Sequence, residues 1–208
     1  ELANLVGDWL KNEVAPVCGE YDEKNEFPEK LYEQMTELGL NIMCTPEEYG
    51  GLDLSAVAQT LIAEQLGRYE VGLGSAVGAN ASATHLMNQF GSPEQKKIFF
   101  DILVNGGWAA FCLTEPNAGS DAGSVTTTAE ESEDGYVING TKCFITNGGI
   151  AGVYLVFASM DRSLGVKGIS CFLVERDRKG ISIGKHENKM GIRLSNTTEV
   201  VLDHVKVP

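Results

Sequence analysis

The pattern of this sequence changes near residue 105, and the change limits the chain to a fold of two differently built parts. Between Leu2 and Leu10, and again further along, apolar residues recur every three or four positions, which predicts amphipathic helices. Beyond Trp108, short β-prone runs alternate with Gly, Asp and Asn turns. The sequence therefore predicts the α+β class, with an all-helical domain over 1–106 and an antiparallel β-barrel or sandwich domain over 107–208.

Local signals mark the ends of several elements. Pro28 opens a periodic stretch that stops at Gly39, and a second stretch opens at Ser55 and stops at Gly67. The run Ser92-Pro93-Glu94-Gln95 supplies an N-cap Ser with Pro at the first helical position. The β-prone runs cover 108–113, 123–129, 136–145, 152–159, 168–174 and 198–207. Asp134-Gly135 predicts a hairpin turn, with Thr126, Thr127 and Thr128 on the partner strand.

Charge and cysteine content narrow the possible partners. The formal net charge of −13 would repel nucleic acid and anionic lipid headgroups, and most of it, −11, lies in residues 1–104. The five cysteines form no CxxC pair and favour a reducing compartment over a disulfide framework or zinc site. His85, His186 and His204 lack metal-ligand spacing, so no metal is predicted. We find no apolar run of membrane-spanning length, and no membrane role is expected.

Two stretches carry groups suited to a flat polar ligand that bears phosphates. In the first, Phe111 to Asp121, backbone N–H groups near Gly119 and the Ser120 hydroxyl suit a pyrophosphate, and Thr114 suits a heterocycle edge. In the second, Asn139 to Gly149, Phe144 suits a ring system and Thr146 a ring nitrogen. Taken singly, the first stretch is at least as typical of an ordinary strand followed by a loop, and the second is more typical of an ordinary hairpin.

Taken together and in order, these stretches resemble the acyl-CoA dehydrogenase family, which has a TEPxAGSD loop followed by NGxKxxITNG. The run from Gly91 to Lys97, the run from Lys167 to Ser170, and the run from Lys189 to Thr197 extend the resemblance over the whole chain. The missing initiator Met and the end at Val207-Pro208 indicate a segment of a longer protein. The family's C-terminal four-helix domain would then lie outside this sequence.

The resemblance implies that this chain binds FAD. Phe111, Cys112, Leu113 and Thr114 would contact the pyrimidine side of the flavin, and Ser120 would serve both the FAD pyrophosphate and the acyl-CoA. The family usually has Trp where this chain has Phe144, so stacking is expected to survive while the indole donor is lost. Phe144, Ile145 and Thr146 would cover the other flavin edge.

The resemblance also implies α,β-dehydrogenation of an acyl-CoA thioester to the trans-2-enoyl-CoA, as in fatty-acid β-oxidation. In the family a Glu of the C-terminal domain removes the α-proton while the β-hydrogen leaves as hydride to the flavin. No catalytic base is therefore assigned here, and Glu115, which belongs to the shared loop motif, is expected to be structural.

Further expectations concern the substrate, partners and location. The resemblance implies that Ser75, Gly78 and Ser82 line an acyl-chain pocket, where small side chains would leave room for a longer or bulkier acyl group, unless a neighbouring helix fills that space. The family implies electron transfer to an electron-transfer flavoprotein, a homotetramer at full length, and a place in the bacterial cytoplasm or mitochondrial matrix. Two other functions stay open: an acyl-CoA oxidase, and a non-catalytic FAD- or CoA-binding fragment or subunit.

Overall fold

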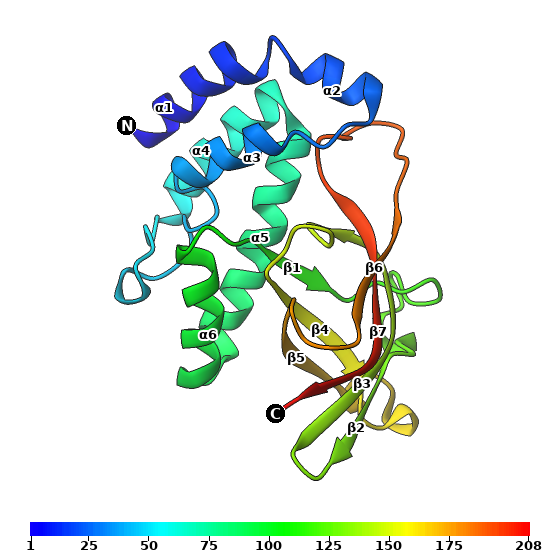
Figure 1. Cartoon of the computed structure of the whole chain (residues 1–208). Coiled ribbons are helices and arrows are strands. Elements are labelled where there is room, and N and C mark those ends of the chain that lie inside the picture. Colours follow the sequence, from blue (N-terminus) through cyan, green and yellow to red (C-terminus); the bar gives the residue numbers. More distant parts are fainter. The chain divides into compact units, whose positions relative to one another are not determined.

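The computed structural model describes residues 1–208, which form two compact units (Figure 1). The helical unit consists of residues 1–107 and 188–196, and the β unit consists of residues 108–187 and 197–208. The α+β class predicted from the sequence is confirmed. None of the helices combines the length and the apolar character needed to cross a membrane.

The helical unit is built from α-helices joined by short π- and 3₁₀-helical turns. These elements are α1 (Leu2–Trp9), η1 (Leu10–Val14), α2 (Cys18–Lys24), α3 (Glu29–Glu37), η2 (Glu47–Tyr49), α4 (Ala56–Tyr69), α5 (Val71–Phe90) and α6 (Pro93–Val104). The predicted stop at Gly39 is confirmed, because this residue takes a left-handed φ of 74° just after α3. The predicted stop at Gly67 is wrong: α4 continues to Tyr69, since Gly67 does not take the left-handed conformation that ends a helix.

Buried amides tie the helices together. The side-chain amide of Asn41, in the loop after α3, donates to the carbonyl oxygens of Leu103 (2.8 Å) and Gly107 (3.0 Å). The Asn80 amide, on α5, donates in turn to the carbonyl oxygen of Asn41 at 2.7 Å. The loop after α3 is thereby joined both to α5 and to the end of α6.

A segment from the second half of the sequence completes the helical unit. Residues 188–196, between β6 and β7, bind α2 and α3. The backbone N–H of Arg193 donates to Asp22 Oδ1 at 3.1 Å, and its guanidinium Nη1 donates to the Asp22 carbonyl oxygen at 3.1 Å. The hydroxyl of Tyr32 donates to the carbonyl oxygen of Leu194, whose side chain is fully buried.

The β unit is one curled sheet with two short 3₁₀ turns. Its elements are β1 (Ala109–Cys112), η3 (Ala122–Ser124), β2 (Thr128–Ser132), β3 (Gly135–Thr146), β4 (Val153–Ser159), η4 (Arg162–Gly168), β5 (Ile169–Glu175), β6 (Ile181–His186) and β7 (Thr197–Val207). The strand order is β1-β4-β2-β3-β7-β6. The remaining strand, β5, pairs with β4 and lies outside this order. Most pairs are antiparallel as expected, but β1 and β2 both run parallel to β4, so the sheet is mixed.

The predicted strand at 123–129 is displaced in the structure. The strand β2 begins only at Thr128, and residues 122–124 form a 3₁₀ turn instead. The amides of Thr126 and Thr127 bind the Glu115 carboxylate, which takes them out of the sheet ladder. The hairpin predicted at Asp134-Gly135 is confirmed, with Ser132 paired to Gly135, but of the three threonines expected on the partner strand only Thr128 lies in β2.

We expect Ser92→Ala to lower the free energy of unfolding by about 1 kcal/mol, because it removes the N-cap of α6. Ser92 Oγ accepts from the Gln95 N–H at 3.2 Å, and Gln95 Oε1 accepts from the Ser92 N–H at 2.9 Å, which makes a capping box. Urea unfolding with Ser182→Ala, on the edge strand β6, as control would measure the difference. Equal stability of the two variants would contradict the prediction.

Candidate cofactor site in the β unit

A β-bulge near the end of β3 shapes the candidate site. Lys142 pairs with Val200 of β7 and Ile145 pairs with Thr198, so three steps along β3 match two along β7. The extra residue gives Phe144 a left-handed φ of 56°, which is uncommon for an aromatic residue. Its side chain is 62% exposed, whereas Ile145 is buried. The bulge therefore presents one aromatic ring at the surface of the β unit.

The bulge also frees backbone groups to hold the loop after β1. The Cys143 N–H donates to the carbonyl oxygen of Thr114 at 2.9 Å instead of bonding to β7. Lys142 Nζ donates to the carbonyl oxygen of Leu113 at 3.1 Å. The end of β1 and the end of β3 thus lie side by side, although about 30 residues separate them in the sequence.

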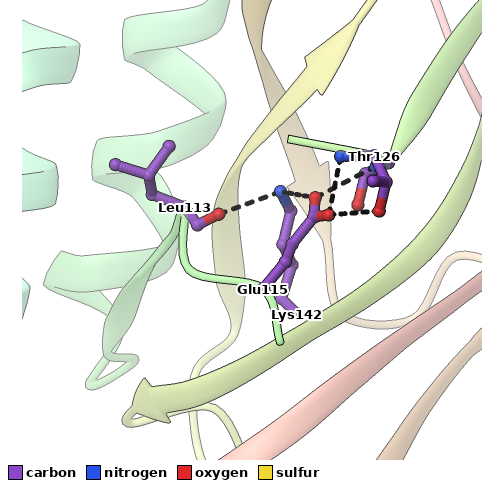
Figure 2. A network of polar contacts seen from close by, with 5 residues as sticks. Leu113, Glu115, Thr126 and Lys142 are labelled. Atoms are coloured by element: carbon purple, nitrogen blue, oxygen red, sulfur yellow. Dashed lines mark hydrogen bonds and ion pairs between the residues drawn. The ribbon is translucent and has the colours of Figure 1, made fainter. Parts of the chain in front are cut away.

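A buried ion pair lies beneath this junction (Figure 2). Lys142 Nζ lies 2.7 Å from Glu115 Oε1, and the two side chains are 0% and 1% exposed. Glu115 also accepts hydrogen bonds from the Thr126 N–H (2.7 Å), the Thr126 hydroxyl (2.5 Å) and the Thr127 N–H (3.0 Å). The carboxylate is therefore held by three donors besides the lysine, as a buried charge requires. These contacts agree with the structural role expected for Glu115.

The pKa values of the pair follow from burial and these partners. Burial alone would raise the pKa of Glu115, but hydrogen bonds from Lys142, Thr126 and Thr127 outweigh it and hold the pKa at about 2. Burial lowers the pKa of Lys142, and the neighbouring Glu115 carboxylate opposes that shift. Glu115 is therefore ionised at neutral pH, but a carboxylate with so low a pKa is too weak a base to suit general-base catalysis.

Hydrogen bonds of buried side chains hold the turn after β3 in place. The Asn147 side-chain amide donates to the carbonyl oxygen of Ala109, at the start of β1, at 3.2 Å. The buried Tyr154 hydroxyl donates to the Gly148 carbonyl oxygen at 2.9 Å and accepts from Arg176 Nη1 at 2.8 Å. Burial raises the pKa of Tyr154 to about 12, so its hydroxyl keeps its proton at physiological pH. The turn is thus attached to both β1 and β4.

The residues singled out in the sequence differ in how they face solvent. Leu113, Thr114 and Thr146 are half-buried, and Ser120 lies exposed in the loop that follows the short 115–118 bridge. The Phe111 ring packs 4.8 Å from the Phe157 ring. The side chains of Cys112 and Ile145 are buried in the sheet core, so only their backbone groups are available to a ligand.

The small residues of α5 lie on its outer face. Ser75 is half-buried, and Gly78 and Ser82 are exposed. The opposite face carries buried side chains such as Leu73 and Val77. The Ser82 hydroxyl donates to the carbonyl oxygen of Gly78 at 2.9 Å, one turn earlier in the same helix. Within the helical unit, no helix covers Gly78, where a β-carbon would meet no atom within 4 Å.

Comparison with protein families matches both units. Residues 1–107 match the acyl-CoA dehydrogenase N-terminal domain, and residues 110–205 match the acyl-CoA dehydrogenase middle domain. The chain belongs to the acyl-CoA dehydrogenase family. The resemblance found in the sequence motifs is thereby confirmed.

Individual relatives agree with this assignment. The chain is 41% identical over 209 residues to a short-chain-specific acyl-CoA dehydrogenase of Clostridium acetobutylicum, covering 100% of this chain and 55% of that protein. Butyryl-CoA dehydrogenase from Megasphaera elsdenii has a similar structure, with a TM-score of 0.93 and 39% identity over 100% of this chain and 56% of its own.

A glutaryl-CoA dehydrogenase from Mycobacterium smegmatis, in complex with FADH2, gives a TM-score of 0.89 at 31% identity, covering 100% of this chain and 53% of its own. The chain spans about half the length of the relatives it matches.

Sequence reasoning assigned no role to Lys142 or Asn147, although both lie in the second motif. One signal for Lys142 was available: alternation along β3 puts it on the same face as the buried Ile138. An inward-facing lysine requires a buried anion nearby. Sequence spacing gives no indication that this anion is Glu115, which lies 27 residues earlier.

We expect Lys142→Met and Glu115→Gln each to lower the free energy of unfolding by about 3–5 kcal/mol, because each leaves a buried group without its partner. The free energy of unfolding should fall less in the double variant than in either single variant, since no buried charge is then left unpaired. Lys24→Met with Glu20→Gln is the matched control, because both side chains of that ion pair are exposed, at 57% and 68%, and it should lose far less stability than either single variant. Urea unfolding at neutral pH measures all four. Single variants as stable as the control would contradict the expectation.

The pH dependence of stability should also reflect the lowered pKa of Glu115. Its pKa of about 2 lies below its ordinary value of 4.5, so the unfolded state binds the proton more tightly. The resulting stabilisation, about 3 kcal/mol, is present above pH 4.5 and is lost as the pH falls toward 2. Glu115→Gln should abolish this part of the acid dependence.

Two further variants sharpen this pH test. Thr126→Val removes one donor to Glu115 and should therefore narrow the pH range over which stability is lost. Thr141→Val, outside the network, is the control. An unchanged acid profile in Glu115→Gln would argue against a strongly lowered pKa.

Proposed function

We propose that the full-length protein is an FAD-dependent acyl-CoA dehydrogenase that converts an acyl-CoA thioester to the trans-2-enoyl-CoA. The observation that carries the proposal is the junction of the two motif segments: Leu113 and Thr114 are hydrogen-bonded to Lys142 and Cys143, the residues just before Phe144, although they come from distant parts of the sequence. Membership of the acyl-CoA dehydrogenase family supports it.

The residues of the β unit fit a flavin with an attached pyrophosphate. Phe144 offers an exposed ring on which an aromatic ligand can stack. Thr146 follows two positions later, and the carbonyl oxygen of Thr114 accepts from the Cys143 N–H, next to Phe144; both threonines are half-buried. Gly119 has a negative φ, and a β-carbon built there would meet no protein atom within 4 Å. Neither backbone strain nor crowding by the protein explains a glycine at this position, but close approach of a phosphate does.

In this proposal the chain binds and orients the reactants. The Thr114 and Thr146 hydroxyls would hydrogen-bond the flavin edges, Phe144 would cover one side of the ring system, and Ser120 would bind the pyrophosphate and the acyl-CoA. When bound, FAD supplies the acceptor for the β-hydrogen, which leaves as hydride. We assign no residue of this chain as the base for the α-proton; Glu115 is unsuited because it is buried, both its oxygens already accept hydrogen bonds, and its pKa of about 2 makes it a weak base. Electrons would then pass to an electron-transfer flavoprotein.

The names of the relatives favour a short acyl group. The dehydrogenase from Clostridium acetobutylicum is short-chain specific, and the enzyme from Megasphaera elsdenii is a butyryl-CoA dehydrogenase. We therefore take butyryl-CoA as the first substrate to test. Ser75, Gly78 and Ser82 stay candidates for the lining of the acyl pocket, because their side chains are small and lie on the outer face of α5.

Anaerobic addition of butyryl-CoA to the purified full-length protein should bleach its visible flavin absorption. Free CoA at the same concentration, which lacks a reducible or oxidisable acyl group, is the control and should leave the spectrum unreduced. Slow reoxidation on admission of air is expected of a dehydrogenase, whereas rapid reoxidation would identify an oxidase. A full-length protein that binds no flavin would disprove the proposal and favour a non-catalytic role.

A further inference from the structure

We propose that Glu115 and Lys142 act as a positioning pair for the cofactor: their buried ion pair sets the spacing between the end of β1 and the Phe144 bulge of β3. This inference rests on the proposed FAD site and adds two residues to it that do not face the ligand. Both side chains are inaccessible to solvent, at 0% and 1% exposure, so they act through the backbone segments that they join.

The contacts of the pair converge on three successive residues. Lys142 Nζ binds the Leu113 carbonyl oxygen and the Glu115 carboxylate, and the adjacent Cys143 N–H binds the Thr114 carbonyl oxygen. Residues 113–115 are therefore attached to β3 at every position. A shift of Lys142 would move the Leu113 and Thr114 backbone relative to Phe144, two residues further along β3.

The carboxylate has little freedom to rotate. Thr126 donates to Glu115 Oε2 through both its N–H and its hydroxyl, while Lys142 and the Thr127 N–H donate to Oε1. Both carboxylate oxygens are thus committed, and the direction in which Glu115 holds the lysine is fixed. Figure 2 shows the ammonium group between the Leu113 carbonyl oxygen and this carboxylate.

Stability alone does not account for such a pair. A buried ion pair is often no more stabilising than apolar residues of the same volume, because desolvation offsets the attraction between the charges. An apolar pair would fill the space but would donate no hydrogen bond to the Leu113 carbonyl oxygen. The distinctive contribution of Lys142 and Glu115 is therefore the geometry of the loop that precedes Ser120.

The bulge supplies a reason why that geometry must be held. Phe144 is in the left-handed region at φ 56°, a conformation that persists only where its surroundings impose it. Lys142, at the start of the bulge, and Ile145, at its end, are both buried. Anchoring Lys142 through Glu115 keeps the strained residue directed outward, where the ring would meet the flavin.

The test uses the full-length protein and the double variant Glu115→Gln with Lys142→Met, which removes both charges and leaves none unpaired. We expect its dissociation constant for FAD, measured by titrating the apoprotein and following flavin fluorescence, to rise about tenfold or more. We also expect a shifted flavin absorption band and a shifted midpoint potential in protein saturated with FAD. The variant Lys24→Met with Glu20→Gln, which removes an ion pair whose two side chains are both exposed, should match the unmodified protein in all three quantities.

A purely structural role would lower the melting temperature but leave the spectrum and potential of the FAD-saturated double variant unchanged, and that result would overturn the proposal. If the double variant does not fold, the spectrum and midpoint potential of FAD-saturated Thr126→Val test the proposal in the same way. This variant removes one donor to Glu115, keeps both charges, and should give a smaller shift in the same direction. Absence of FAD binding by the unmodified full-length protein would instead refute the proposed function, and this inference with it.

Discussion

The buried ion pair between Glu115 and Lys142 is the interaction on which the candidate site depends. It joins three parts of the chain, at residues 113–115, 126–127 and 142–143, that no regular strand pairing brings together at this point. Because Glu115 uses the amides of Thr126 and Thr127, the same interaction also fixes where β2 begins. One buried carboxylate thus determines both a boundary of the sheet and the path of the loop beside it.

Features set by neighbouring residues could be predicted from the sequence, and features set by distant contacts could not. The capping box at Ser92 and the left-handed Gly39 involve partners within four residues, so composition and spacing reveal them. The run 123–129 reads as a strand because Thr favours strands, yet Glu115 recruits its amides from eleven residues away. The helix α2 and the strand β6 were not predicted, since both are short and lack strong start signals.

The same division holds within the site. The two motifs were recognised as candidate ligand-binding segments, and the structure joins them through the Cys143 N–H, which donates to the Thr114 carbonyl oxygen, and the Lys142 side chain, which donates to that of Leu113. Recognition of a motif does not show which side chains are accessible. Cys112 and Ile145 lie in those segments but point into the core. For Phe144 and Ile145 that distinction depends on the bulge, which arises from the register with β7 and therefore from residues 198–200.

Phe144 combines two requirements that usually fall on different residues. The bulge requires a left-handed backbone, which a glycine would adopt without strain, whereas an aromatic side chain adopts it at a cost of about 1–3 kcal/mol. A glycine would relieve that strain but would present no ring at the surface. The chain has phenylalanine at this position, so the exposed ring, rather than ease of backbone conformation, explains the residue. The anchoring of Lys142 beneath it supplies the constraint that such a strained residue needs.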